Sequence, residues 1–310
     1  MDHDALFKEL LRTFFAEFMQ LFFPDVADQL DFTEIIFLDK ELFSDLADGI
    51  QREPDLIAQL RTKDGRPEIV LVHTEVQGQR RSTFGARMFE YFALLRWRFK
   101  LPVFPIVVYL SPGAGGLVTE QYVERLFDRD VNVFSFSAVG LPDLQSDDYL
   151  SNTNVLGPAL SALMKASHLG RVAQKYQSLL ALARSGLDPA RLALLSNVVE
   201  SYMQLNEQDQ TQFAELIAAT GGEEVKEMIS VYEQRGIEKG FEQGIEQGIE
   251  QGIARGKRDT LLRQMNFKFG RVPDEVRSQV ERITNADVLD ALTDRIMTAN
   301  TLDEMRLPEE

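Results

Sequence analysis

An Asp-Gly pair between two apolar runs restricts the fold of the first part of this chain more than any other feature. The pair is Asp64-Gly65, and the apolar runs span residues 56–60 before it and residues 69–72 after it. Asp-Gly between apolar runs is a strong hairpin signal, because glycine adopts positive φ without steric cost. The sequence therefore predicts two antiparallel strands joined by a tight turn.

Two acidic residues stand at the far ends of these predicted strands. Asp55 begins the first strand, and Glu75 lies near the end of the second strand. Antiparallel pairing across the turn returns both carboxylates to the same end of the hairpin. Mg²⁺ prefers carboxylate oxygens and keeps waters and phosphates as its other ligands. The pattern therefore predicts a divalent-metal site built on Asp55 and Glu75.

Ordinary structural roles are the alternatives for the residues of this hairpin. Asp55 follows Pro54, and turn residues are common after proline. Glu75 is harder to explain in this way, because residues 69–72 are typical of a central strand, where an uncompensated carboxylate is costly to bury. His73 lies two residues before Glu75, and we interpret it as a core histidine rather than as a ligand.

The first 145 residues predict a mixed α/β domain. Apolar residues recur at helical spacing over residues 4–23 and stop before Pro24, which predicts one helix whose phenylalanines enter the core. Strand patterns and one further helix follow. In order, we expect a strand at residues 35–38, the hairpin, a helix at residues 83–99, and strands at residues 104–110 and 131–136.

After residue 145 the strand patterns end and only helical spacing remains. We expect a helical domain over residues 146–235, a Gly-x-x-x segment over residues 236–256 and a small C-terminal helical domain over residues 257–310. The helices expected in the first of these regions span residues 154–168, 171–184, 189–205, 208–220 and 223–235.

The glycine repeat of residues 236–256 has two interpretations. Glycine costs about 1 kcal/mol in a helix interior, so regularly spaced glycines favour the close approach of a partner helix. A flexible linker is the alternative. The first interpretation predicts a homo-oligomer that assembles through the helical C-terminal half.

Several short runs within residues 3–110 match one known family. Pro54-Asp55 followed by Glu75-Val76-Gln77 is similar to the PD-(D/E)XK nuclease motif, with Gln in the Lys position. The other matching runs are His3 to Lys8, Phe37 to Phe43, Lys63 to Gly65, Glu75 to Arg80, Arg87 to Tyr91 and Leu101 to Ile106. Together these runs resemble the bacterial Rpn family of recombination-promoting nucleases, which are often labelled transposase-like.

The resemblance implies a restriction-endonuclease-like mixed sheet flanked by helices, and a metal-dependent DNA endonuclease. In that family role Asp55 and Glu75 hold Mg²⁺, or alternatively Mn²⁺ or Ca²⁺, with the backbone carbonyl of Val76 as a further ligand. Gln77 orients the attacking water or the phosphate. Because Gln offers only dipoles where Lys offers charge, either the rate is low or another residue such as Arg87 supplies the charge.

The charge of the chain restricts how it can bind DNA. A formal charge of −16 excludes a protein that coats nucleic acid with its whole surface, although one basic face is enough for binding. Basic residues do follow the motif: Arg80, Arg81, Arg87, Arg96, Arg98 and Lys100. We expect Arg80 and Arg87 to contact DNA phosphates, and the resemblance suggests Arg87 near the scissile phosphate. A solvated or salt-bridged arginine is the alternative for Arg87.

Length and composition restrict the other possibilities. A chain of 310 residues with 44% apolar content can hold a sizeable core and more than one domain. Its apolar runs fall short of the ~18 continuous residues of a membrane helix, and Met1 to Asp4 lack the features of a signal peptide, so we expect no membrane partner and a cytoplasmic protein. The absence of cysteine excludes disulfides and thiolate metal sites.

Two further functions compete with the endonuclease hypothesis. The first is a catalytically weak or inactive nuclease-fold protein that serves as an interaction or assembly module; the acidic charge and the glycine repeat favour it. The second is a classical DDE-type transposase. It is disfavoured, because the spacing of the acids fits the hairpin better and no DNA-recognition domain is visible.

Overall fold

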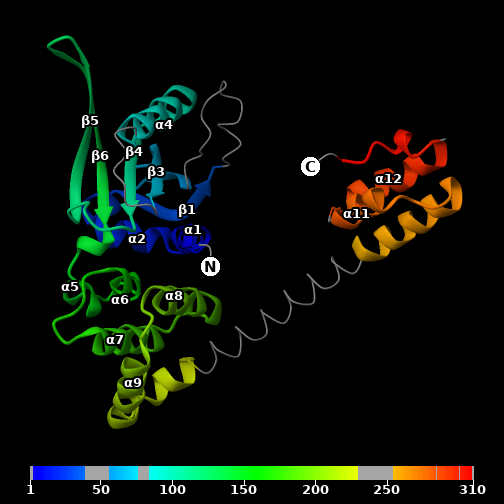
Figure 1. Cartoon of the computed structure of the whole chain (residues 1–310). Coiled ribbons are helices and arrows are strands. Elements are labelled where there is room, and N and C mark those ends of the chain that lie inside the picture. Colours follow the sequence, from blue (N-terminus) through cyan, green and yellow to red (C-terminus); the bar gives the residue numbers. More distant parts are fainter. Residues whose placement is uncertain are drawn as a thin grey trace. The chain divides into compact units, whose positions relative to one another are not determined.

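The computed structural model of the chain describes residues 3–38, 56–75, 84–229, 254–283, 285–299 and 301–308. These residues belong to two compact units, Met1–Ser230 and Val231–Glu310 (Figure 1). The described residues of the first unit form two core clusters, and those of the second unit form one. The first unit combines helices and strands, whereas only helices are described in the second. The expected α+β class with an all-helical C-terminal half is confirmed.

Among the described residues of the first unit, six strands form one mixed sheet in the order β1-β2-β3-β4-β6-β5. The strands are β1 (Leu30–Phe37), β2 (Leu56–Thr62), β3 (Pro67–Glu75), β4 (Val103–Tyr109), β5 (Leu117–Leu126) and β6 (Arg129–Gly140). Strands β3 and β6 run parallel to β4, and the other neighbouring pairs are antiparallel. Strand β4 is therefore central, and its apolar sequence fits a strand covered on both faces.

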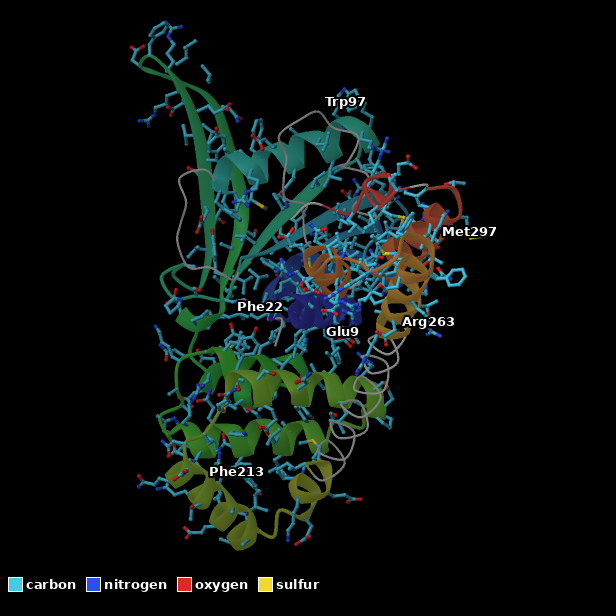
Figure 2. The ribbon with its side chains drawn as sticks, turned by 45° about the vertical axis from the view of Figure 1, so that its right-hand side comes forward. Glu9, Phe22, Trp97, Phe213, Arg263 and Met297 are labelled. Carbon is cyan, nitrogen blue, oxygen red and sulfur yellow. The ribbon has the colours of Figure 1, made fainter. Side chains whose placement is uncertain are left out.

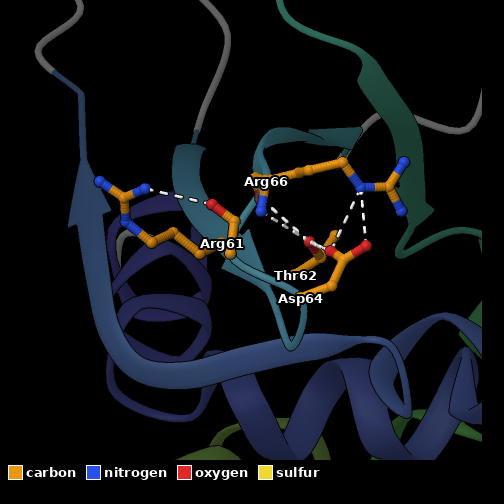
Figure 3. Close-up of polar contacts among 5 residues, drawn as sticks. Arg61, Thr62, Asp64 and Arg66 are labelled. Atoms are coloured by element: carbon orange, nitrogen blue, oxygen red, sulfur yellow. Dashed lines mark hydrogen bonds and ion pairs between the residues drawn. The ribbon is translucent and has the colours of Figure 1, made fainter.

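The β2–β3 hairpin forms as the sequence predicts. Its last pair joins Arg61 to Pro67, and Gly65 adopts a φ of +88° in the turn. The Arg66 Nε donates a 2.9 Å hydrogen bond to the Asp64 carboxylate, which also accepts from the Thr62 hydroxyl (Figure 3). The Thr62 hydroxyl, and after it the Arg66 guanidinium, hold the pKa of Asp64 below its ordinary value. Local side-chain bonds thus reinforce the glycine in fixing the turn.

Helices cover both faces of the sheet (Figure 1). On one face lie α1 (His3–Thr13), α2 (Phe15–Phe22) and α3 (Pro24–Ala27), whose apolar side chains share a core with Ala58, Val70 and Ile106. On the other face lies α4 (Phe84–Phe99), whose side chains share a second core with Ile57 and Val107. The alternation of Ile57 and Ala58 between the two cores follows from the two-residue period of a strand.

The prediction of a single helix over residues 4–23 is wrong in one respect. The chain leaves helical geometry at Phe14, where φ is −121° and ψ is 33°, so that two helices form. The core role of the phenylalanines is confirmed, because the side chains of Phe14, Phe15 and Phe18 are fully buried. The burial of two consecutive residues does not require this break, because Leu10 and Leu11 on the continuous helix α1 are also both fully buried.

The helices after the sheet continue the core of the α1–α2 face. They are α5 (Asp147–Leu150), α6 (Leu156–Leu160), α7 (Arg171–Ala183), α8 (Pro189–Tyr202), α9 (Glu207–Thr220) and a helix over residues 223–229, with 3-10 turns η2 (Leu141–Asp143) and η3 (Ser161–Leu163). Arg191 on α8 pairs with Glu17 on α2, and its guanidinium lies 4.5 Å from the Phe14 ring centroid. The boundary expected near residue 145 therefore falls within one continuous core.

The expected helix over residues 154–168 does not form as one element. Helix α6 ends at Leu160, and a 3-10 turn carries the chain to Met164, whose ψ of 174° is extended. The Ser161 hydroxyl donates to the Pro158 carbonyl at 2.7 Å and contacts the Ser178 hydroxyl at 2.9 Å. Such side-chain bonds compete with a continued helical backbone, which explains the early end.

In the second unit, a helix over residues 254–269 packs with α11 (Asp274–Arg282), α12 (Ala286–Thr298) and the 3-10 turn η4 (Asp303–Met305). Leu261 and Leu289 are fully buried at the centre of its core. The Lys268 ammonium donates to the Ile296 carbonyl at 2.6 Å and so joins the end of one helix to α12. Within the described residues of both units, no helix combines the length and apolar character needed to cross a bilayer.

Candidate functional site

The structure describes part of the expected metal site. Glu75 is the last residue of β3, and β2 begins at Leu56, directly after Asp55 in the chain. Four of the expected site residues lie outside the described residues: Asp55, Val76, Gln77 and Arg80. Among the residues that are described, no three His, Cys, Asp or Glu side chains gather closely enough to hold a metal ion. The expected ligand set stays a prediction.

The register of the hairpin determines where the chain before β2 arrives. Leu56 pairs with Val72, and Glu75 follows Val72 by three residues on β3. At about 3.3 Å per residue, Glu75 lies roughly 10 Å along the sheet from the level of Leu56. The pairing therefore returns the start of β2 to the edge of the sheet at which β3 ends.

Strand β4 ends at the same edge as β3. Glu75 is in register with Tyr109, the last residue of β4, and the two strands are parallel. Neighbouring strands lie about 4.8 Å apart, so the backbone of Tyr109 is directly beside that of Glu75. The carboxyl ends of parallel strands are where open α/β sheets commonly place their ligands. We use the name sheet-edge site for this edge of the sheet, where β3 ends at Glu75, β4 ends at Tyr109 and the chain enters β2 at Leu56.

A cavity of about 560 Å³ opens beside the sheet-edge site, between the start of α4 and strand β5. The aromatic residues Phe84, Tyr109 and Phe136 line it, and the first two rings lie 5.9 Å apart between centroids. Thr119, Glu120 and Gln121 of β5 also contribute to its lining. The side chains of Phe84, Tyr109 and Phe136 are buried, so these rings belong mainly to the core behind the cavity.

Tyr109 and Glu120 join across this cavity. The Tyr109 hydroxyl donates a 3.1 Å hydrogen bond to the Glu120 carboxylate. Tyr109 comes from the end of β4 and Glu120 from the edge strand β5, which is separated from β4 by β6. Neither residue is among those that the sequence predicts at a site, because their 11-residue separation matches no motif and only the strand order brings them together.

Arg87 is the expected DNA-phosphate residue that the structure describes. Its guanidinium carbon lies 5.4 Å from the centroid of the Phe84 ring, which in turn contacts the Tyr109 ring. A cation over an aromatic ring at a partly exposed position contributes about 0.5–1 kcal/mol. The contact holds a positive charge on the α4 side of the cavity.

The glycine-rich loop after β4 is held by an acidic residue. The backbone N–H groups of Gly113 and Gly115 donate to the Asp143 carboxylate at 2.9 and 2.8 Å. These bonds, the one from Gly115 first, hold the pKa of Asp143 below its ordinary value. Since Ala114 lines the cavity, Asp143 fixes one of its walls. Gly115 and Asp143 lie 28 residues apart, and no sequence motif predicts that they are in contact.

The far end of α4 carries an exposed basic and aromatic surface. It consists of Arg96, Trp97, Arg98 and Lys100. Trp97 is 67% exposed, and the Lys100 ammonium lies 5.5 Å from its ring centroid (Figure 2). Arg96, Arg98 and Lys100, with Arg87, are the described basic residues of the segment that follows the motif.

Comparison of the chain with family models, with curated proteins and with solved structures finds no match. The resemblance to the Rpn nucleases therefore depends on the sequence motifs alone. The sheet-edge site is interpreted below from its own geometry and from those motifs.

Proposed function

We propose that this chain is a metal-dependent DNA endonuclease that hydrolyses phosphodiester bonds at the sheet-edge site. The observation that carries the proposal is the β2–β3 register, which returns the chain at Leu56 to the edge where β3 ends in Glu75. This register supports the proposal that Asp55, the residue before β2, shares one site with Glu75. The Rpn-like motifs at the same positions are consistent with this chemistry.

The atoms that would bind the cation suit a hard divalent metal ion. They belong to the side chains of Asp55 and Glu75 and to the backbone carbonyl of Val76. Each of the three would coordinate the metal through an oxygen atom, which Mg²⁺ prefers as a ligand and which Mn²⁺ and Ca²⁺ also bind. When bound, such a cation neutralises phosphate charge and lowers the pKa of a bound water. In the proposal, these residues hold the cation and set the position of the phosphate beside β3.

The remaining residues of the proposal act on the phosphate and the water. Gln77 orients the attacking water through its amide group, since it has no charge to offer. Arg87 offers a guanidinium fork to two phosphate oxygens from the α4 side. Arg80 and the exposed Trp97 surface contact the DNA backbone further from the bond that is cut. Within this proposal the protein acts in the cytoplasm.

Plasmid cleavage in Mg²⁺ tests the proposal. Wild type is compared with Asp55→Ala and Glu75→Ala, and with Glu68→Ala as a matched control at the opposite end of β3, where Glu68 pairs with Leu60. The first two variants should lose about 100-fold or more in rate, because each removes a ligand, while the control retains wild-type cleavage. Cleavage that survives both substitutions would mean that other residues do the chemistry.

A second candidate is an assembly module with a weak or inactive nuclease fold. Three large apolar side chains are almost fully exposed: Phe127 at 93%, Phe267 at 95% and Met297 at 79%. Phe127 lies at the tip of the β5–β6 hairpin, which projects from the rest of the first unit (Figure 1), and Met297 lies on α12 of the second unit (Figure 2). No described contact joins these side chains into one patch, so each is only a possible point of contact for a partner.

Self-association through the helical C-terminal half is part of both candidates. Gly256, the last glycine of the repeat, lies in the helix over residues 254–269, and a Cβ built there has no heavy atom within 4 Å. The face is thus open to a neighbouring helix. Light scattering of the full chain measures the mass, and Gly256→Leu should lower it if this face packs closely. Absence of cleavage with every divalent metal, together with a stable oligomer, would favour the second candidate.

A further inference from the structure

Strand β5 is an outer strand of the sheet and has one neighbour among the described strands (Figure 1). That neighbour is β6, which pairs with β5 from Leu117 to Leu126. Proteins usually protect such an edge by a short strand, by proline or lysine, or by a bulge. Strand β5 is ten residues long and contains neither proline nor lysine, and the extra residue in its ladder with β6, Val131, belongs to β6. An edge without this protection can accept a further strand.

The exposed face of the β5–β6 pair is uncharged over most of its length. Side chains of a strand alternate between two faces, and one face joins the core under α4 through Tyr122, Phe134 and Phe136. The alternate positions, which are mostly exposed, are Leu117, Thr119, Gln121 and Val123 on β5 and Val133, Ser135 and Ser137 on β6. In a chain with 26% charged residues and a formal charge of −16, two copies repel each other least where they meet on such a surface.

We propose that β5 pairs antiparallel with β5 of a second copy of this chain, with the two Val123 residues opposite each other on a two-fold axis. This inference does not depend on the proposed endonuclease function. Opposite residues of an antiparallel pair lie on the same face, so the axis has to pass a residue and not the midpoint between two residues. An axis at Glu120, Tyr122 or Glu124 places carboxylates opposite each other, which is destabilising. An axis at Arg125 does the same with two guanidinium groups.

Two axis positions in the middle of β5 avoid like charges, Gln121 and Val123. Val123 is the register partner of Val133 on β6, and Val133 is 54% exposed. An axis at Val123 therefore aligns two Val123–Val133 pairs into one row of four valines across the joined sheet. It also places Arg125 opposite Gln121, whose amide oxygen can accept from the guanidinium. An axis at Gln121 would instead place Val123 opposite Thr119, so the Val123 axis gives the better cross-strand pairs.

Introduced cysteines test this register in the full chain, which contains no cysteine of its own. Val123→Cys should form a disulfide-linked dimer under mild oxidation, because opposite Cα atoms of antiparallel strands lie about 4.5–5.5 Å apart, which a disulfide can span. Gln121→Cys is the matched control on the same face of the same strand. Its two copies would lie about 13 Å apart and should not be linked. A mixture of Gln121→Cys and Arg125→Cys should be linked, because the register places these two positions opposite each other.

Two lysine substitutions separate edge pairing from the packing of two exposed faces. Val123→Lys places two ammonium groups opposite each other at the axis. Val133→Lys adds the same charge to the same face one strand further in, where the two copies lie about 14 Å apart. Each substitution is added to both members of the Gln121→Cys and Arg125→Cys mixture. Val123→Lys should lower the linked fraction about tenfold, whereas Val133→Lys should leave it within about twofold.

Non-reducing gels measure the linked fraction, and thermal melts show whether each variant is folded. If Val123→Cys lowers the melting temperature, the mixture of Gln121→Cys and Arg125→Cys, at exposed positions, takes its place in the test. Linking of Gln121→Cys alone as strong as that of the mixture, or equal losses with the two lysines, would overturn the inference. Association through the helical C-terminal half would not reproduce the expected result, because it does not set the register of β5.

Discussion

Gly140 on β6 allows a close contact that shapes the cavity. It is the register partner of Tyr109, and an added Cβ would lie 2.7 Å from the Cβ of Ala114 and 3.2 Å from the backbone nitrogen of Gly116. The φ of Gly140 is −90°, which any residue adopts, so the cost of Gly140→Ala is steric. Because carbon atoms prefer separations of about 3.5–4.0 Å, the Ala114 loop has to move by roughly 1 Å.

The expected loss of stability follows from this overlap. Overpacking a closely packed contact costs about 1–3 kcal/mol, and Gly140→Ala should destabilise the fold by that amount. Ala114→Gly should cost about 1 kcal/mol alone, because it removes one buried methyl group and adds backbone freedom. The double variant removes the Cβ–Cβ overlap. It should therefore be more stable than the sum of the single variants predicts, by about 1 kcal/mol or more.

Urea unfolding of the four proteins, followed by circular dichroism, measures this coupling. Additive losses of stability, or a Gly140→Ala protein as stable as wild type, would refute the packing argument.

Three further outcomes follow from described contacts. Glu200→Ala should destabilise the first unit by about 2 kcal/mol in urea unfolding, because it leaves the ammonium of Lys175, whose side chain is 8% exposed, without the carboxylate 2.7 Å away. The Ser167 hydroxyl, and after it His168, lower the pKa of Asp147 to about 2, so its stabilising contribution is present above pH 3.8 and lost as the pH falls toward 2. Asp147→Asn should remove that part of the acid dependence in thermal melts. Under the proposed function, Arg87→Gln should lower the cleavage rate about 10- to 100-fold at saturating DNA.

Each of these outcomes has a result that would contradict it. A Glu200→Ala protein with wild-type stability would mean that the Met203 carbonyl, 3.2 Å from the Lys175 ammonium, suffices as its partner. An unchanged acid profile in Asp147→Asn would place the acid-sensitive group elsewhere. If Arg87→Gln changes only the apparent affinity for DNA, Arg87 binds the backbone and does not act at the scissile phosphate.

The sequence was most informative where local signals decide the structure. Asp64-Gly65 between apolar runs predicts the hairpin because turn chemistry and strand period act over a few residues. Phe14 shows the limit of this reasoning. Apolar spacing continues through the break between α1 and α2, so the spacing predicts the burial of Phe14 and Phe15 but not the change of backbone angles at Phe14.

The candidate site depends on contacts that local signals do not determine. The bond from Tyr109 to Glu120 requires the strand order β4-β6-β5, and the contact of Asp143 with Gly115 spans 28 residues. Parallel register between β3 and β4 is set by packing against helices on both faces, which no sequence period encodes. For this reason the β2–β3 hairpin was predictable and the cavity near its open end was not, while the metal site on Asp55 and Glu75 stays a prediction.

Manganese binding tests most directly whether Asp55 and Glu75 share one cation. Calorimetric titration of the full chain with Mn²⁺ is compared for wild type, Asp55→Asn, Glu75→Gln and the control Glu68→Gln. We predict a site in wild type that each of the first two substitutions weakens about 100-fold and that the control leaves unchanged. Wild-type Mn²⁺ affinity in both Asp55→Asn and Glu75→Gln would contradict the account.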